Sequence, residues 1–391
     1  ARGFDEYFGH TAGHWGEYFD APLEDSRGRL VRTQGYIVDV CTDRALAFIE
    51  KNKGRPFFCY VPFTTPHSPW AVPDKYWRRL KDAPVMQRAT LPEQEDLDQT
   101  RCALAMLENQ DWNVGRALTK LRELGLEDNT IVVYFSDNGP NSWRYNGGMK
   151  GRKGSTDEGG IRSVCYIRWP ASLPAGQKVT QISAAIDLLP TLTSLAGIPR
   201  AGDKPLDGRD LAPLLRNRDA DWHDRMIFSV WNKRISVRTQ THRLDQAGRL
   251  FDMAADPGQK SPINDRQPEL AARLAAAAEA WREEMFGAAA AAGTKSGVKR
   301  AGGNGVDPCP IPVGYLEFPI TILPARDGEP RGGLKRSSGA PNCSYFVNWT
   351  SRDDRMEWLL DVHVAGRYHV AIDYTCPLAD AGSTIELEFK G

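Results

Sequence analysis

The sequence predicts an α/β fold with a largely parallel sheet between helices, followed by a small antiparallel α+β subdomain and a C-terminal β-sandwich. In the first 198 residues, segments with helical periodicity alternate with short runs that are apolar at every position. Runs that are apolar on both faces are typical of parallel strands covered by helices. From residue 199 onward the apolar segments become short and alternating, which is typical of antiparallel strands with one exposed face.

The elements of the first part can be placed in order along the chain. Residues 39–51 carry apolar side chains at helical spacing, and residues 104–121 carry an apolar stripe on a longer helix that ends at Gly125. The Pro-rich, charged stretch 69–92 predicts an irregular surface segment. Three apolar runs of strand length are expected to be buried strands: 56–63, 130–136 and 163–168.

Four parts are expected in all: an α/β domain at 1–198, an α+β subdomain at 199–287, a linker at 288–311 and a β-sandwich at 312–391. Residues 269–286 of the second part are rich in Ala and Leu and predict a helix. The linker is expected because Ala, Gly, Lys and Ser dominate it. Strands of the sandwich are expected at 345–347, 358–364, 368–374 and 384–389.

The composition excludes several classes of protein. The 391 residues include 50 Lys plus Arg and 50 Asp plus Glu, for a formal net charge of +0, whereas binding to nucleic acid or to anionic membranes needs a basic excess. No apolar run approaches the roughly 20 residues of a spanning helix. The cysteines do not form a Cys-x-x-Cys motif, and two of the three C-terminal ones could pair in an exported protein: Cys309, Cys343 and Cys376.

Polar clusters lie next to all three predicted strands. His67 follows the first strand, Asp137 and Asn138 follow the second, and the charged segment 150–162 precedes the third. Ligands of open α/β sheets bind beyond the carboxyl ends of the strands, so we expect these clusters to share one site. Hard oxygen donors, an imidazole and a lysine suit a cation site that binds an anionic ester.

Each cluster also has a simpler interpretation. Asp137, Asn138 and Gly139 have the composition of a common turn, because Asn and Gly tolerate positive φ and Asp bonds its own backbone. His67 lies between prolines and could be an ordinary loop residue. The basic residues of 150–153 could form a solvated edge, which is the usual environment of a charge run.

Four motifs together resemble those of the type I sulfatases of the alkaline phosphatase superfamily, in order and in spacing: Gly3–His10, Thr65–Pro69, Phe135–Gly139 and Lys153–Gly160. The resemblance covers roughly residues 1–285. It implies an alkaline phosphatase-like fold and hydrolysis of sulfate esters, with a sulfated carbohydrate or an aryl sulfate as substrate. Because sulfatases that act on polysaccharides are typically exported, it also implies a periplasmic or secreted protein.

The resemblance implies a role for each matching residue. Asp137 and Asn138 would bind a divalent cation, usually Ca²⁺ in this family. His67 would contact the sulfate ester and stabilise or protonate the leaving oxygen. Lys153 would pair with the sulfate oxygens, with Lys150 as a competing candidate. Substrate contacts at the mouth of the pocket are expected from two histidines, His10 and His14.

In this family the nucleophile is a formylglycine, which is made from the first residue of the pattern Cys/Ser-x-Pro/Ala-x-Arg. The nucleophile has no counterpart here, because none of the seven cysteines begins that pattern. We expect the nucleophile, together with further Asp ligands of the metal, in a segment that precedes Ala1, so the chain alone should not hydrolyse aryl sulfates.

Two alternative functions remain. One is a phosphodiesterase or phosphonate monoester hydrolase of the same superfamily, and the other is a non-catalytic carbohydrate-binding protein in which aromatic residues of the sandwich contact sugar.

Overall fold

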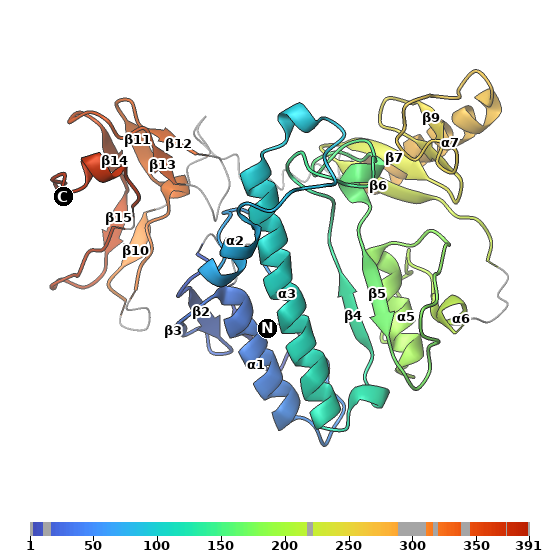
Figure 1. Ribbon diagram of the computed structural model, residues 1–391, viewed down its shortest axis with the longest axis horizontal. Coiled ribbons are helices and arrows are strands. Elements are labelled where there is room, and N and C mark those ends of the chain that lie inside the picture. The colour runs from blue at the N-terminus through green and yellow to red at the C-terminus, as the bar shows by residue number, and fades with distance from the viewer. Residues whose placement is uncertain are drawn as a thin grey trace. The chain divides into compact units, whose positions relative to one another are not determined.

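The computed structural model describes residues 3–10, 17–216, 222–287, 310–315, 320–337, 345–372 and 374–389. Contacts between Cα atoms divide the chain into two compact units. The first comprises residues 1–299 with 340–343, and the second comprises residues 300–339 with 344–391. Figure 1 shows the elements of both units. No described helix is both long enough and apolar enough to span a membrane.

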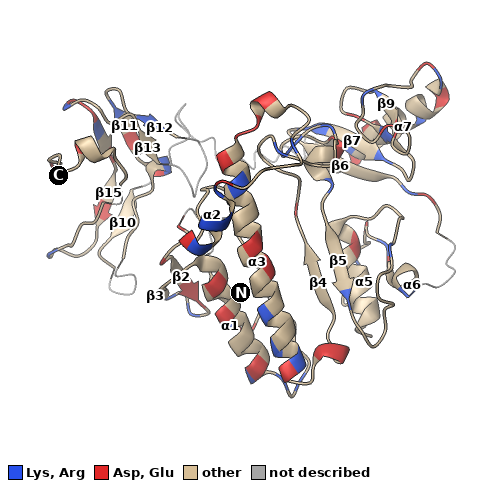
Figure 2. Cartoon of the chain, viewed as in Figure 1, with Lys and Arg blue, Asp and Glu red and all other residues tan. Residues whose placement is uncertain are grey.

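Two long helices form the centre of the first part of unit 1: α1 (Ile37–Lys51) and α3 (Leu97–Glu123). They lie side by side (Figure 1), and Asp39 of α1 accepts hydrogen bonds from Asn109 (2.8 Å) and Asn113 (2.7 Å) of α3. The side chain of Asp96 caps the start of α3 by accepting from the amide of Gln99 at 3.0 Å. Acidic and basic residues are interspersed along both helices (Figure 2).

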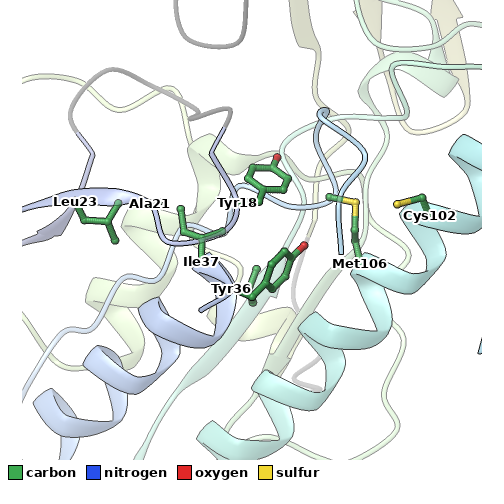
Figure 3. Packing of buried hydrophobic residues seen from close by; sticks show 8 residues of the cluster. Tyr18, Ala21, Leu23, Tyr36, Ile37, Cys102 and Met106 are labelled. Carbon is green, nitrogen blue, oxygen red and sulfur yellow. The ribbon is translucent and has the colours of Figure 1, made fainter. Parts of the chain in front are cut away.

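A small antiparallel sheet and a short helix complete this part: β1 (Phe8–Gly9), β2 (Pro22–Asp25), β3 (Leu30–Arg32) and α2 (Asp74–Leu80). Its core contains Tyr18, Leu23 and Tyr36 packed with Met106 of α3 (Figure 3). The rings of Tyr18 and Tyr36 meet edge to face at 6.2 Å. The hydroxyl of Tyr18 emerges from this core toward the segment that contains His67.

The expectation of a largely parallel sheet is wrong for the described residues. The strands β4 (Val132–Phe135) and β5 (Cys165–Arg168) pair antiparallel, with Tyr134 opposite Tyr166. The segment 56–63 is extended but joins no described ladder. Between the strands, only the short helix α4 (Glu158–Ile161) interrupts a long loop, which returns the chain to the end of β4 that it left. An apolar run predicts burial, but it does not reveal the direction of the strand.

The rest of unit 1 contains a helical segment and a second antiparallel sheet. The helices are α5 (Leu188–Leu195) and α6 (Ala212–Leu215). The sheet has the order β6-β7-β8-β9, and α7 packs on it through Leu274, which is fully buried. Its elements are β6 (Ile227–Trp231), β7 (Arg234–Arg238), β8 (His242–Leu244), β9 (Leu250–Asp252) and α7 (Pro268–Arg282).

The described residues of unit 2 form three two-stranded ladders in the region where a β-sandwich is expected. They pair β10 (Ile311–Val313) with β15 (Leu360–Val362), β11 (Glu329–Arg331) with β14 (Arg355–Glu357), and β12 (Lys335–Arg336) with β13 (Phe346–Val347). The described residues of the strands expected at 368–374 and 384–389 have no ladder partner. The alternating side chains there are uncovered, with Ile372 45% and Leu387 56% exposed. Of the expected linker, residues 288–309 lie outside the described part.

Short helical turns complete the described elements: η1 (Pro92–Gln94), η2 (Glu127–Asn129), η3 (Ala185–Asp187), the π-helical turn η4 (Glu283–Gly287), η5 (Ala325–Asp327) and η6 (Leu378–Asp380).

Candidate active site

The segment that follows β4 and the loop that contains Lys153 are in direct backbone contact. The amide of Gly139 donates to the carbonyl of Gly160 at 3.0 Å, and the amide of Lys153 donates to the carbonyl of Pro140 at 2.8 Å. A Cβ atom on Gly139 would lie 2.0 Å from the carbonyl oxygen of Gly159, so only glycine permits this approach. These contacts hold the segment that contains Asp137 and Asn138 against the loop that contains Lys153.

The segment that contains His67 is tied to β4 through α3. The hydroxyl of Tyr18 donates to the carbonyl of His67 at 2.8 Å. The buried side chain of Gln110 donates to the hydroxyl of Thr65 at 2.7 Å and accepts from the hydroxyl of Tyr134 at 3.1 Å. Because Tyr134 lies in β4, three residues before Asp137, this chain of contacts couples the His67 segment to the strand that carries the predicted metal ligands.

A second contact joins the His67 segment to the loop after β4. The guanidinium of Arg144 lies 4.7 Å from the ring centroid of Trp70 and donates to the hydroxyl of Ser142 at 2.7 Å. Burial lowers the pKa of Arg144, although Glu95 opposes this shift. On the His67 side, Nδ1 of the imidazole lies 2.8 Å from the carbonyl oxygen of Ser68. The loop and the His67 segment therefore form one connected site region.

The two candidate lysines differ in their partners. Nζ of Lys150 forms ion pairs with Asp157 at 3.1 Å and with Asp245 at 3.2 Å. Nζ of Lys153 forms no ion pair and no hydrogen bond with the part of the chain that the structure describes. The charge of Lys150 is thus compensated within the fold, whereas the charge of Lys153 is available to an anionic ligand.

Glu158, at the start of α4, is held in a buried ionic network. Nη2 of Arg243 in β8 donates to its carboxylate at 2.6 Å and Nε donates at 3.2 Å, and both side chains are almost fully buried. Arg238 and Arg162 approach the same carboxylate at 3.4 and 3.3 Å. Burial by itself would raise the pKa of Glu158, but these three guanidinium groups outweigh it, Arg243 most strongly, and the pKa is lowered.

Further hydrogen bonds anchor the Lys153 loop to the β6–β9 sheet. Nη1 of Arg243 donates to the carbonyl of Thr156 at 2.9 Å, and the hydroxyl of Ser236 donates to the same carbonyl at 2.8 Å. The side-chain amide of Gln259 donates to Asp157 at 3.0 Å, and its oxygen accepts from the amide of Glu158 at 2.9 Å. Sequence reasoning missed Arg243 and Gln259 because each is a single polar residue outside any recognisable motif.

A sequence model of the family described as Sulfatase matches residues 1–198, which is half of the chain. The chain belongs to the sulfatase family. Steryl-sulfatase from Mus musculus is 30% identical to it over 294 residues, covering 62% of this chain and 44% of the relative. N-acetylgalactosamine-6-sulfatase from Canis lupus familiaris is 31% identical over 256 residues, covering 58% and 44%. The expected family membership is confirmed.

Solved structures extend the comparison of this sulfatase-family chain. The crystal structure of Ps i-CgsB superposes with a TM-score of 0.64 at 26% identity, covering 72% of this chain and 67% of the other. That protein has also been crystallised in complex with k-i-k-neocarrahexaose. The likeness supports the alkaline phosphatase-like fold. The chain spans less than half of the length of the two curated relatives named above.

The donors for the expected Ca²⁺ are incomplete in the described part of the sulfatase chain. Asp137 is exposed and Asn138 is half-buried, and together they offer two kinds of hard oxygen. No group of three or more His, Cys, Asp or Glu residues gathers anywhere among the described residues. Ca²⁺ takes six to eight oxygen ligands. These two residues do not make a calcium site by themselves.

Other predicted features of the sulfatase chain fall at the edge of the described part. His10 is half-buried directly after β1. His14 lies outside the described residues, as do Cys309 and Cys343, so the predicted role of His14 and the predicted disulfide stay predictions. Cys376 is an exposed free thiol.

Replacing Glu158 with Gln should destabilise unit 1 by about 3–5 kcal/mol at pH 7, because Arg243 would keep its buried charge without a counter-charge. The pKa of Glu158 is lowered in the folded chain, so its ionised form stabilises the fold above the ordinary value of 4.5. That contribution is lost as the pH falls through the folded-state pKa. Urea unfolding at pH 7 and at pH values below 4.5 should therefore show the difference between wild type and variant shrinking with acidity.

The exposed Glu93, which forms no ion pair with the described residues, provides the matched control. Glu93→Gln should change the free energy of unfolding by less than about 0.5 kcal/mol at either pH. A Glu158→Gln variant as stable as wild type at pH 7 would contradict the assigned role of the buried network.

Substituting Gly139 with Ala should destabilise the fold by about 1–3 kcal/mol, because the new methyl group would be forced against the carbonyl of Gly159. Gly115 in α3 is the control, since a Cβ there meets no atom within 4 Å. Gly115→Ala should stabilise the protein by up to about 1 kcal/mol. Thermal unfolding of both variants tests the pair, and equal melting temperatures would count against the close approach.

Proposed function

We propose that this chain supplies the sulfate-binding and leaving-group side of a sulfuric ester hydrolase that acts on sulfated glycans. The observation that carries the proposal is the backbone contact between the Asp137–Gly139 segment and the Lys153 loop. It holds two hard oxygen donors and a lysine without an ionic partner among the described residues on adjoining segments. Family membership supports the reaction class. It also disfavours the phosphodiesterase alternative, because the curated relatives named above are sulfatases.

Lys153 and His67 have complementary roles in this proposal. Nζ of Lys153 pairs with the non-bridging oxygens of the sulfate and offsets the charge that develops on them. Nδ1 of His67 donates to the carbonyl of Ser68, which makes Nε2 the atom that exchanges a proton. His67 acts as the acid in its imidazolium form, in which both ring nitrogens carry a proton. As the sulfuryl group passes to an attacking nucleophile and the bond between sulfur and the sugar oxygen breaks, Nε2 gives its proton to that oxygen, which leaves as a neutral hydroxyl group, and His67 is left as the neutral imidazole protonated on Nδ1. Lys150, which is already paired with two carboxylates, positions the loop and does not bind substrate in this proposal.

The remaining elements of the proposal follow from the same site. Asp137 and Asn138 would contribute two oxygen ligands to a Ca²⁺ ion, which would supply further positive charge for the sulfate. A sulfated glycan is the proposed substrate class, supported by the names of two similar proteins: an N-acetylgalactosamine-6-sulfatase and a protein crystallised with k-i-k-neocarrahexaose. We propose periplasmic or secreted localisation, because such polymers lie outside the cell.

Replacing Lys153 with Ala should weaken the binding of a sulfated oligosaccharide about tenfold or more, because a charge-assisted contact to the sulfate is lost. Isothermal titration of the full chain with the sulfated oligosaccharide and with its desulfated counterpart measures this effect. Lys178→Ala, at an exposed lysine without an ion pair to any described residue, is the matched control and should bind as wild type does. Equal affinity of wild type for the sulfated and desulfated sugars would contradict the proposed function.

We also propose that unit 2 binds carbohydrate. The proposed binding face comprises three exposed side chains in and beside β13: Tyr345 (61%), Val347 (37%) and Trp349 (42%). Lys335 lies opposite Val347 and therefore shares this face. Exposed aromatic rings beside a cation suit a sulfated sugar chain. Trp358, another aromatic residue of unit 2, packs edge to face on Phe346 at 5.8 Å.

Replacing Trp349 with Ala should reduce the retardation of the chain in a gel that contains a sulfated polysaccharide. The control is Leu378→Ala, because Leu378 is 92% exposed but lies outside this face. Unchanged retardation of the Trp349 variant would contradict the proposed sugar-binding face.

A further inference from the structure

Arg152, the exposed residue before Lys153, has a backbone that is held in a tight turn. Arg152 and Lys153 lie between Gly151 and Gly154, both of which have a φ of +86°. The carbonyl of Arg152 accepts from the amide of Ser155 at 3.0 Å, which closes a tight turn around the pair. The amide of Lys153 also donates a hydrogen bond to the carbonyl of Pro140. These hydrogen bonds fix the backbone of both basic residues within the loop.

The side chain of Arg152 is also fixed, although it is exposed. Its guanidinium lies 5.4 Å from the ring centroid of Trp143, and Nη1 donates to the carbonyl of Asn141 at 2.6 Å. No carboxylate of the described chain pairs with it. A long, flexible side chain loses conformational entropy when it binds a ligand. Arg152 has already been restricted by Trp143 and Asn141, so less entropy remains to be lost.

The neighbouring Arg144 shows that such stacking does not by itself make a binding site. Arg144 is also stacked on a tryptophan, Trp70, but it is half-buried and both Nε and Nη2 donate to the hydroxyl of Ser142. Arg152 differs because only Nη1 has a partner among the described residues. Its Nε and Nη2 groups form the planar pair of donors that matches a sulfate or a carboxylate.

We propose that Arg152 forms a second anion subsite, which binds a sulfate or carboxylate group of the glycan adjacent to the ester held by Lys153. This inference rests on the proposed function, because Lys153 defines which group is the reacting ester. It assigns a preference for sugar chains that carry a further negative charge. Trp143 acts as a positioning residue, since it holds the guanidinium and does not itself pair with the anion.

The test compares the affinity of the full chain for three oligosaccharides of equal length: one with a single sulfate, one with two sulfates, and one with a single sulfate and a uronate carboxylate. Arg152→Ala should weaken binding of at least one doubly charged sugar about tenfold, while the affinity for the monosulfated sugar stays within twofold of wild type. The ligand that is affected identifies the second anion as sulfate or carboxylate. Trp143→Leu should produce a smaller loss for the same ligand.

Two control variants separate the possible results. Lys153→Ala should weaken all three ligands, and Lys178→Ala should weaken none. If Arg152→Ala weakens all three ligands equally, Arg152 and Lys153 bind the same sulfate, and the second subsite is disproved. If Arg152→Ala changes no affinity, the subsite is also disproved, while the proposed function stands on the Lys153 result. If wild type binds none of the sulfated sugars, the proposed function itself fails.

Discussion

The arrangement of the candidate site depends on the buried ion pair between Glu158 and Arg243. Glu158 begins the short helix that follows the Lys153 loop, and Arg243 belongs to β8 of a separate antiparallel sheet. A four-residue helix has too few internal hydrogen bonds to hold its own position. Its position is fixed from outside by Arg243, whose Nε and Nη2 both donate to Oε2 of Glu158, and by hydrogen bonds with Gln259 and Ser236. The antiparallel sheet, far along the chain from the motifs of the candidate site, is therefore a structural support of that site.

Two sets of contacts connect the candidate site residues to regular elements of the fold. Gly159 and Gly160 lie against Gly139, so the position of α4 determines where Asp137 and Asn138 can lie. On the other side, Gln110 and Tyr134 hold the His67 segment to β4. The site is thus assembled from three segments that are individually irregular, and each is fixed by contacts with a regular element.

The motifs of the candidate site could be recognised from the sequence, but the residues that fix their positions could not be predicted from it. His67, Asp137 and Lys153 stand in short patterns of unusual composition, so they could be identified without a structure. Arg243 could not, because a single arginine in a strand carries no signal until its partner is known. The direction of the strands was also mispredicted, since β4 and β5 have the apolar composition of parallel strands but pair antiparallel. In unit 2, alternation at 368–374 predicted a strand, yet the described residues of this segment pair with no other described strand.

The basic residues of the site differ in whether acidic side chains offset their charge. The chain as a whole has no net charge, and Lys150 is compensated by Asp157 and Asp245. Lys153 and Arg152 are not compensated among the described residues, so the positive charge is concentrated at the positions proposed to meet the substrate.

The most direct test of the structural role of the Glu158–Arg243 pair is hydrogen exchange at the amides of Gly139, Lys153 and Gly159 in an Arg243→Met variant. Our account predicts that these amides lose protection while those of α3 keep it. Unchanged protection of the three amides in a folded variant would contradict the account.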